Sequence, residues 1–574
     1  MAEIPAKRRS APLSLYPEIA RAALLRLLAP LRALWRRTWL YRSMLGGPLA
    51  DRIPFHPYDA QPRNLEDADA LLRGRFRFAG ETVDVKDGSI FDSAPPSQAW
   101  AESLHAFAWL PPLATAGGDA ARTLATNLIT QWIKRNARYT EPAWLPHVMA
   151  ARLVHLFAHG RLAIANSDLL WRSKLFVSLR EQSRLLARVA EAAPDGLPRL
   201  QAAAGLALSG VCLEESPKRL EQGVQRLIAE VSGQILPDGG HASRSPQALV
   251  DAYLQVVMVV DALAAKDLEV PQALISAHDR MAPMIRFFRH ADGGLALFNG
   301  SGEGNVKTIE ALLARDQVRG QPFAHARHSG YHRLAAAKTL VIFDTGAPPD
   351  GAFSNQAHAG CLAFELSAGG QRLVVNCGAG AQPKWNDAMR VTAAHSTVTV
   401  ADTSQASVLG DGFARDLIGA RLLGGPAQVD SRRIETAHGW SVEAHHDAYV
   451  PAFGILHERR LTLSPQGLVL TGADRLVPRV SRRGSVPFAV RFHIHPDVRM
   501  SPSENGGIIL KLPTGEGWRF RAGGGEVAIE ESVYLGGESV RRAEQLVVTG
   551  TVKDAAVEIG WVFEQIGIAA PVSA

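Results

Sequence analysis

The stretch QRLVVNCGAGAQPKWNDAMRVTAAHSTVTV, residues 371–400, indicates the fold class of the second half of the chain. Its first part, residues 373–376, is apolar and β-branched and leads into an Asn-Cys-Gly turn. Its last part, residues 397–400, alternates as a half-buried strand does. We therefore expect two neighbouring strands, joined by a connection that carries Arg390 and His395.

The residue types in this connection are those of a chemical site. Arg390 is a permanent cation with several donors, and His395 can move a proton or bind a metal ion near neutral pH. Just upstream, SNQAHAGCLAFELS places His358 before another expected strand. Neighbouring strands would bring His358, Asn376 and His395 together.

The sequence pattern changes near residue 330. Residues 76–92 contain two short alternating pieces, which predict a hairpin, and residues 99–288 have helical length and apolar recurrence between turns. Such helices close into a ring or stack as a solenoid, and the pattern leaves both open. After residue 330, short strands separated by polar turns predict an antiparallel β-sandwich.

Composition limits the class of protein. A chain of 574 residues exceeds what one core usually supports, which favours two domains. The net charge of +6 favours anionic partners, but 62 basic and 56 acidic residues are interspersed, so we expect no nucleic-acid surface. Three cysteines are too few for a disulfide framework.

Residues 1–60 form a basic and apolar segment. Arg21, Arg26 and Arg32 interrupt the apolar core that an export signal requires, and no run of the chain reaches the length of a membrane span. The segment instead predicts a cationic amphipathic helix, kinked at Pro30. Such a helix lies on an anionic membrane surface or docks against the protein body. By sequence the chain is therefore cytoplasmic or membrane-peripheral.

Four phrases in order, AHAGCLAFEL, a Gly-Gly turn, LVVNCG and RVTAAHSTV, resemble the C-terminal domain of the heparinase II/III-like polysaccharide lyases. Members of that family carry similar phrases in the same order: a His-Ala-Asp strand, a Val-Asp-Pro-Gly turn and an Arg-x-Thr-x-x-His segment. The resemblance implies an incomplete (α/α) toroid over residues 61–330, a β-sandwich over residues 331–574, and a cleft between them for a polymer. It also implies a periplasmic or cell-envelope location.

The resemblance implies β-elimination beside a uronic acid. The enzyme must neutralise the carboxylate, remove the weakly acidic C5 proton and protonate the leaving oxygen. We predict Arg390 as the carboxylate neutraliser, and His241 or His395 as a proton-transfer group. The family's tyrosine, in a Ser-Pro-x-Tyr phrase, is absent here, so Tyr253 on the same expected helix is the substitute that we consider. The family's Asn-His-like phrase also has no counterpart in residues 196–210.

Further candidates for substrate binding occur in phrases similar to those of the family. Asp238 lies in an Asp-Gly-Gly-His loop, where it could equally serve the turn alone, and Tyr449 could equally be a packed aromatic residue. The candidates are Trp109, Asp238, Arg244, Trp385 and Tyr449.

The resemblance also suggests zinc, held by His358, Asn376 and His395. Two histidines on adjacent strands suit Zn²⁺, but Asn376 replaces the aspartate of the family and is a poorer ligand. The competing interpretation is that the histidines stabilise the strands through hydrogen bonds or contact sugar directly.

The sequence thus predicts a lyase that acts on an acidic polysaccharide, with the polymer left open. The alternative is a carbohydrate-binding or envelope-assembly protein that has the same fold without lyase chemistry. The missing tyrosine favours the alternative, and the retained Arg-x-Thr-x-x-His segment favours the lyase.

Overall fold

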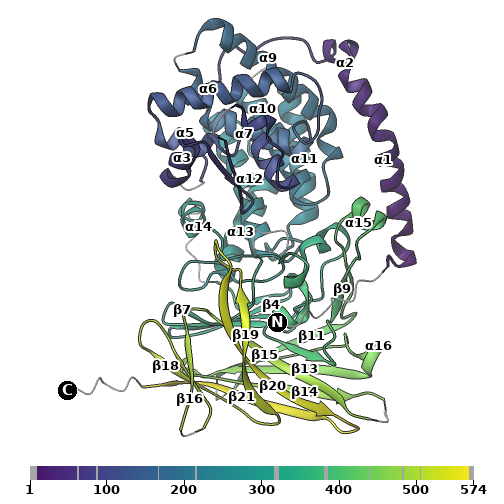
Figure 1. The fold of residues 1–574 in the computed structure, drawn as a ribbon, viewed down its shortest axis with the longest axis vertical. Helices are drawn as coiled ribbons and strands as arrows, with labels where there is room; N and C mark the ends of the chain where they lie inside the picture. Colours follow the sequence, from purple (N-terminus) through teal and green to yellow (C-terminus); the bar gives the residue numbers. More distant parts are fainter. Residues whose placement is uncertain are drawn as a thin grey trace, which may run out of the picture.

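A computed structural model gives the fold, in which a helical half stands on two β-sheets (Figure 1). The structure describes residues 10–60, 64–85, 88–165, 167–213, 216–315, 322–379, 385–436, 439–480, 484–504 and 506–567. The expected fold class, a toroid followed by an antiparallel β-sandwich, is confirmed.

The helical half follows the predicted succession of helices and short loops, with the predicted hairpin near its start. The hairpin strands are β1 (Arg75–Phe78) and β2 (Glu81–Asp84). The helices are α3 (Leu65–Leu72), α4 (Gln98–His105), α5 (Leu110–Ala116), α6 (Gly118–Arg135), α7 (Pro146–His159), α8 (Arg161–Ile164), α9 (Leu169–Val189), α10 (Leu197–Leu213), α11 (Pro217–Gln234), α12 (Pro246–Ala265), α13 (Gln272–Phe288) and α14 (Val306–Leu313).

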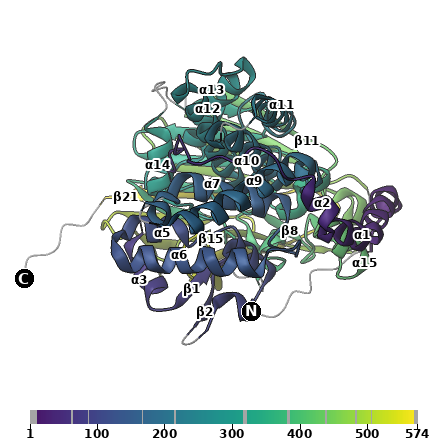
Figure 2. The same ribbon diagram turned by 90° about the horizontal axis from the view of Figure 1, so that it is seen from above.

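Helix α10 lies in the middle of this half, against α7, α11 and α12 (Figure 2). Every residue from Ala202 to Leu213 is buried, which is typical of a helix surrounded by other helices. Glycines allow the close approach. A Cβ atom on Gly205 would lie 2.7 Å from the Cβ of Ala150, and one on Gly223 would lie 2.4 Å from the backbone nitrogen of Ala207.

Helix α12 corrects one expectation. By length and composition it could cross a membrane, although the sequence analysis predicted no such segment. Most of it is buried inside the protein, where Leu249, Val256 and Val259 belong to the core of the helical half.

The sandwich consists of two antiparallel sheets that enclose a common apolar core. One sheet has the order β11-β12-β13-β14-β21-β18-β17-β16. Its strands are β11 (Val429–Thr436), β12 (Gly439–His446), β13 (Ile455–Leu463), β14 (Val469–Pro478), β16 (Arg499–Pro502), β17 (Ile508–Lys511), β18 (Gly517–Ala522) and β21 (Val557–Ile566).

The other sheet has the order β19-β20-β15-β7-β6-β5-β4-β3, and β8 also pairs with β15. Its strands are β3 (His325–Ala326), β4 (Tyr331–Ala336), β5 (Thr339–Asp344), β6 (Phe364–Ala368), β7 (Gln371–Val375), β8 (Val398–Val400), β15 (Val486–Ile494), β19 (Glu526–Tyr534) and β20 (Arg541–Val552). A short pair, β9 (Ala406–Val408) and β10 (Leu422–Gly424), stands apart beside helix α15 (Phe413–Ile418). Helix α16 (Val450–Phe453) lies in the connection between β12 and β13.

The two strands expected from residues 371–400 are β7 and β8. Both strands pair with β15. Strand β7 pairs with the end of β15 at His493 and Ile494, and β8 pairs with the first part of β15 at Phe488 to Val490. The described part of the connection between them carries two short 3-10 turns, Ala388–Arg390 and Thr392–Ala394. This pairing holds the polar connection at the sheet that faces the helical half.

Buried polar contacts join the two halves. Arg244 forms an ion pair with Asp344 and donates from Nε to the carbonyl oxygen of Ser329 at 2.8 Å. Nε2 of His290 lies 2.9 Å from Glu365, and Arg372 pairs with Asp292 at 2.7 Å. These contacts fix one half against the other.

The N-terminal segment forms α1 (Tyr16–Arg37) and α2 (Trp39–Ser43), which run along the side of the molecule (Figure 1). Helix α1 continues through Pro30. Near its first end Glu18 pairs with Arg421 of the sandwich half, and at its other end Arg37 donates to the Tyr139 carbonyl of the helical half at 2.9 Å. The predicted docking against the protein body is therefore present at both ends.

Candidate functional site

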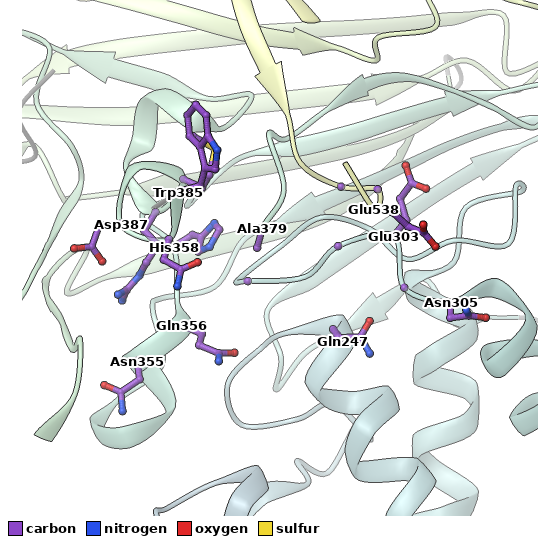
Figure 3. A pocket seen from close by; sticks show the side chains of 18 of the residues that line it. Gln247, Glu303, Asn305, Asn355, Gln356, His358, Ala379, Trp385, Asp387 and Glu538 are labelled. Carbon is purple, nitrogen blue, oxygen red and sulfur yellow. The ribbon is translucent and has the colours of Figure 1, made fainter. Parts of the chain in front are cut away.

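A pocket of about 1030 Å³ lies between the helical half and the sandwich (Figure 3). The helical half contributes α3, α12, α14 and the glycine-rich loop of residues 300–305. The sandwich half contributes the polar connection before β8 and the loop of residues 536–538. The pocket is thus formed by segments far apart in sequence.

His358 lines the pocket immediately after the 3-10 turn Gly351–Gln356. Its backbone N–H donates to Oδ1 of Asn299 at 3.1 Å, and its Nδ1 lies 3.0 Å from Nε2 of His395. Nδ1 of His395 in turn lies 2.9 Å from the carbonyl oxygen of Val391. The Asn299 contact ties His358 to the helical half.

These contacts assign the protons of the two rings. A carbonyl oxygen only accepts, so Nδ1 of His395 carries a proton and its Nε2 is an acceptor. His358 must then donate from Nδ1, which leaves its Nε2 with a free lone pair. Burial lowers the pKa of His395 to about 4 and that of His358 well below its usual value, so both rings are neutral at pH 7. His358 can therefore accept a proton at Nε2.

Arg390 lies beside His358 in the wall of the same pocket. It is 4% exposed, and it donates from Nε to the Ala357 carbonyl at 2.8 Å and from Nη2 to the Ser354 carbonyl at 2.9 Å. Burial lowers the pKa of Arg390 to about 10, which keeps it charged at pH 7. Within the described parts of the chain, no carboxylate forms an ion pair with it. The Asp387 carboxylate is close enough to offset part of this lowering of the pKa by burial but makes no direct ion pair with Arg390, and a buried cation held in this way favours an anionic ligand.

The rest of the lining suits a sugar. Trp385 lines the wall next to these residues (Figure 3), and its ring packs against the apolar cluster of Cys377, Met389, Ala394 and Leu535. Side-chain amides, which pair with hydroxyl groups, are provided by Asn64, Gln247, Asn305, Asn355, Gln356 and Asn386.

Comparisons with known proteins show the family to which the chain belongs. The profile of the family described as heparinase II/III-like, C-terminal, matches residues 318–562. FtsZ-localized protein C of Caulobacter vibrioides is 32% identical over 539 residues, which are 92% of each chain. The chain belongs to the heparinase II/III-like family. The resemblance inferred from the sequence phrases is therefore confirmed.

Solved structures of this family share the whole fold. The crystal structure of heparinase III has a TM-score of 0.70 at 15% identity, and covers 97% of this chain and 93% of its own. Heparan sulfate lyase HepC from Pedobacter heparinus has a TM-score of 0.58 at 17% identity, and covers 97% of this chain and 92% of its own. The toroid is thus common to the heparinase II/III-like proteins and this chain.

Two predicted catalytic residues of the toroid do not reach the pocket. His241 is 3% exposed, and its ring nitrogens lie within hydrogen-bond distance of Ser243 and Gln234. Tyr253 is fully buried in α12, where its hydroxyl lies 3.0 Å from Nε2 of His278. Neither residue lines the pocket, and His241 also contacts the Phe353 ring of the sandwich half, so the catalytic roles of both stay predictions.

Four of the predicted substrate-binding residues also have structural roles. Trp109 is fully buried among helices, and Tyr449 is buried in the sandwich core, where it donates to the Val398 carbonyl. Asp238 accepts hydrogen bonds from the backbone and hydroxyl of Ser329, and Arg244 pairs with Asp344 at the junction. Only Trp385 of this group lines the pocket.

The predicted zinc ligands do not form a zinc site. Oδ1 of Asn376 accepts the Ser396 N–H at 3.0 Å, and Nδ2 of Asn376 donates to Glu365 at 3.2 Å. That leaves His358 and His395 facing each other without a third ligand. Among the described residues, no group of three His, Cys, Asp or Glu side chains is placed to hold a metal ion. The residues present therefore do not fit the zinc that the family resemblance suggested.

The sequence analysis missed the acidic part of the lining. Glu303 lies on the glycine-rich loop before α14, and Glu538 lies on the loop between β19 and β20. The Glu303 N–H donates to the Gly536 carbonyl at 2.7 Å, which joins the two loops. A Cβ atom on Gly302 would lie 2.9 Å from the same carbonyl oxygen, so this glycine allows the close approach. The glycines of these two loops were the available sequence signal.

Proposed function

We propose that this chain binds an acidic polysaccharide in the pocket and cleaves it by β-elimination beside a uronic acid. One observation supports this above all others: the buried cation of Arg390, which makes no direct ion pair in the described chain, lies in the same wall as the free lone pair of His358.

The proposed reaction uses these two side chains. Arg390 binds the uronate carboxylate and withdraws its charge, which makes the C5 proton more acidic. Nε2 of His358 takes that proton, the electron pair of the C5–H bond forms the C4=C5 double bond, and the C4–O4 bond breaks. The imidazolium then returns the proton to O4 of the leaving sugar. His395 accepts from Nδ1 of His358 and keeps Nε2 directed at the substrate.

Binding without cleavage is the second candidate. Among the described residues that line the pocket there is no tyrosine, and His241 and Tyr253 are buried elsewhere. His358 would then have to serve as both base and acid. The relative named for localisation with FtsZ supports a further proposal, that this chain is also cell-associated and is not an exported lyase.

The test measures the ultraviolet absorbance of an unsaturated uronate after the protein is mixed with several acidic polysaccharides. We expect a rise in absorbance that Arg390→Ala and His358→Gln each reduce by about a hundredfold or more. Tyr253→Phe is the control, because it keeps the buried ring and should leave the rate unchanged. Calorimetric binding without any rise in absorbance would support the second candidate. If the protein neither bound nor cleaved any of the polysaccharides, both candidates would be excluded.

We further propose that α1 binds an anionic membrane surface. Ile19 and Ala22 pack toward the sandwich half, whereas exposed side chains form a stripe on the opposite face of the helix. That stripe consists of Leu24, Leu27, Leu31, Leu34 and Trp35. Arg21 and Arg32 border it with positive charge. The stripe is apolar, faces away from the body and is bordered by cations, which suits a lipid headgroup layer.

Sedimentation with vesicles tests this proposal. We expect binding to vesicles that contain phosphatidylglycerol and weak binding to pure phosphatidylcholine vesicles. Leu27→Glu combined with Leu31→Glu should weaken binding by about tenfold or more, because two inserted leucines are lost. Leu169→Glu is the matched control, since Leu169 is 83% exposed on α9 and far from the stripe. Equal loss in the control, or no binding by the unaltered chain, would contradict the proposal.

A further inference from the structure

The charges that line the pocket are mixed. Among the described lining residues the basic ones are Lys307, Arg390 and Arg415, and the acidic ones are Glu66, Glu303, Asp387 and Glu538. Arg415 pairs with Asp387 at 2.7 Å, and the Asp387 carboxylate also offsets part of the lowering of the Arg390 pKa by burial. The remaining two cations therefore face three carboxylates, although the whole chain has a net charge of +6. A site for a uniformly polyanionic chain would have more cations than carboxylates in its lining.

Glu303 is a fixed negative charge in this lining. It accepts a hydrogen bond from the Tyr534 hydroxyl, and its carboxylate lies 3.9 Å from His495. The His495 side chain lowers the pKa of Glu303 to about 2, despite the partial burial that raises it. Glu303 is thus ionised at every pH at which the protein would be assayed.

Glu538 adds a second carboxylate on the same side. It is exposed at the pocket, and no ion pair to it occurs in the described parts of the chain. Figure 3 shows Glu303 and Glu538 across the pocket from His358 and Trp385. Arg390 belongs to the His358 wall, so the positive and negative ends of the pocket lie on opposite sides.

We propose that the pocket takes a saccharide with two kinds of charge: a carboxylate, which binds Arg390, and a free amine, which binds Glu303 and Glu538. The ligand class is then an acidic polymer with unacylated amino sugars, and polysulfated chains are disfavoured. This proposal rests on the proposed function, because it places the uronate at Arg390. A protonated amine gains from two nearby carboxylates, whereas a sulfate in the same position is repelled.

Three forms of one polymer test the proposal. They share a backbone of alternating glucuronate and glucosamine, in which the nitrogen is acetylated, free or sulfated. Binding is measured by calorimetry at low and at physiological ionic strength, since screening weakens surface charge effects. We expect the free-amine form to bind about tenfold or more tightly than the sulfated form, with the acetylated form between them.

Variants separate the two ends of the pocket. Glu538→Gln should reduce the preference for the free amine several-fold, and it is the cleaner change because Glu303 also contacts Tyr534. Glu269→Gln, at an exposed position on the loop after α12, is the matched control and should change nothing. Arg390→Ala should weaken all three forms alike.

The outcomes distinguish this proposal from the proposed function. Tightest binding of the sulfated form, or an unchanged preference in Glu538→Gln, would overturn the two-charge ligand and leave an acidic-polysaccharide site. No binding of any form would overturn both.

Discussion

Two fully buried arginines, one in each half of the molecule, are held differently. In the helical half, Arg152 is fully buried without a carboxylate partner in the described chain, and its guanidinium lies 4.0 Å from the Trp132 ring centroid. In the sandwich, Arg459 donates from Nε and Nη2 to the two oxygens of Asp474, at 2.7 and 3.0 Å. His457 and Trp561 contact the same carboxylate.

The difference bears on the pocket. Nη1 of Arg459 donates to the carbonyls of Leu362 and Ser396, both at 2.7 Å. Those two residues follow His358 and His395 closely in the chain, so the charged cluster fixes the backbone on which both histidines stand. Arg152 instead donates to the carbonyls of His105 and Ala143 within the helical half. The Arg459 cluster thus supports the backbone of the pocket, whereas Arg152 supports the packing of the toroid.

The largest expected effect comes from breaking the sandwich cluster. Asp474→Ala leaves Arg459 buried without its counter-ion and should lower the free energy of unfolding by about 3–5 kcal/mol. Arg152→Met removes a cation that has no ionic partner, and should cost about 1–3 kcal/mol for the acceptors left without a donor. Denaturant unfolding measures both. Equal losses would contradict the difference between the halves.

A smaller effect should follow from pH. Burial lowers the pKa of His395 to about 4, so between about pH 6.5 and pH 4 the unfolded chain binds the proton more readily than the folded one. The contribution of His395 to the free energy of unfolding is therefore fully present above about pH 6.5. It falls as the pH drops and is about 3 kcal/mol smaller at pH 4. In His395→Gln, the loss of unfolding free energy between pH 6.5 and pH 4 should be smaller by about 3 kcal/mol, so the curve of stability against pH should be flatter. An unchanged slope would mean that His395 titrates normally.

The smallest expected effect concerns zinc. Because Asn376 is committed to Ser396 and Glu365, added zinc should move the melting temperature by less than about 1 °C, and a chelator should leave it unchanged. Asn376→Asp is the informative variant, since it restores a better ligand beside the two histidines. A rise in the melting temperature of the unaltered chain that saturates at one zinc ion per chain would contradict the interpretation that Asn376 is hydrogen-bonded and does not bind zinc.

Local patterns were enough to predict the elements of the fold. The strands on either side of Arg390, the hairpin near residue 80 and the long helices all follow from apolar periodicity. The ring of helices came from the family resemblance, because periodicity does not say how helices close. Arg390, His358 and Trp385 were predicted and line the pocket, since the family phrases that carry them lie next to paired strands.

The remaining site residues depend on contacts that no local pattern shows. The Asp-Gly-Gly-His loop has the composition of an exposed loop, but Asp238 and Arg244 are covered by sandwich residues about 90 to 100 positions away. Glu303 and Glu538 come together only because the Glu303 N–H reaches the Gly536 carbonyl. Such pairs are decided by the folded chain as a whole.

The placement of α1 has a consequence for the order of synthesis. Glu18 and Arg421, which fasten this helix to the sandwich half, are 403 residues apart in the chain. At about 5–20 residues per second, a ribosome needs roughly 20–80 s to make the second of these residues after the first. During that interval the Glu18 end of α1 has no partner in the sandwich, whereas Arg37 at the other end can already reach Tyr139 of the helical half. The leucine stripe is therefore presented on the helical half before the sandwich half has been made.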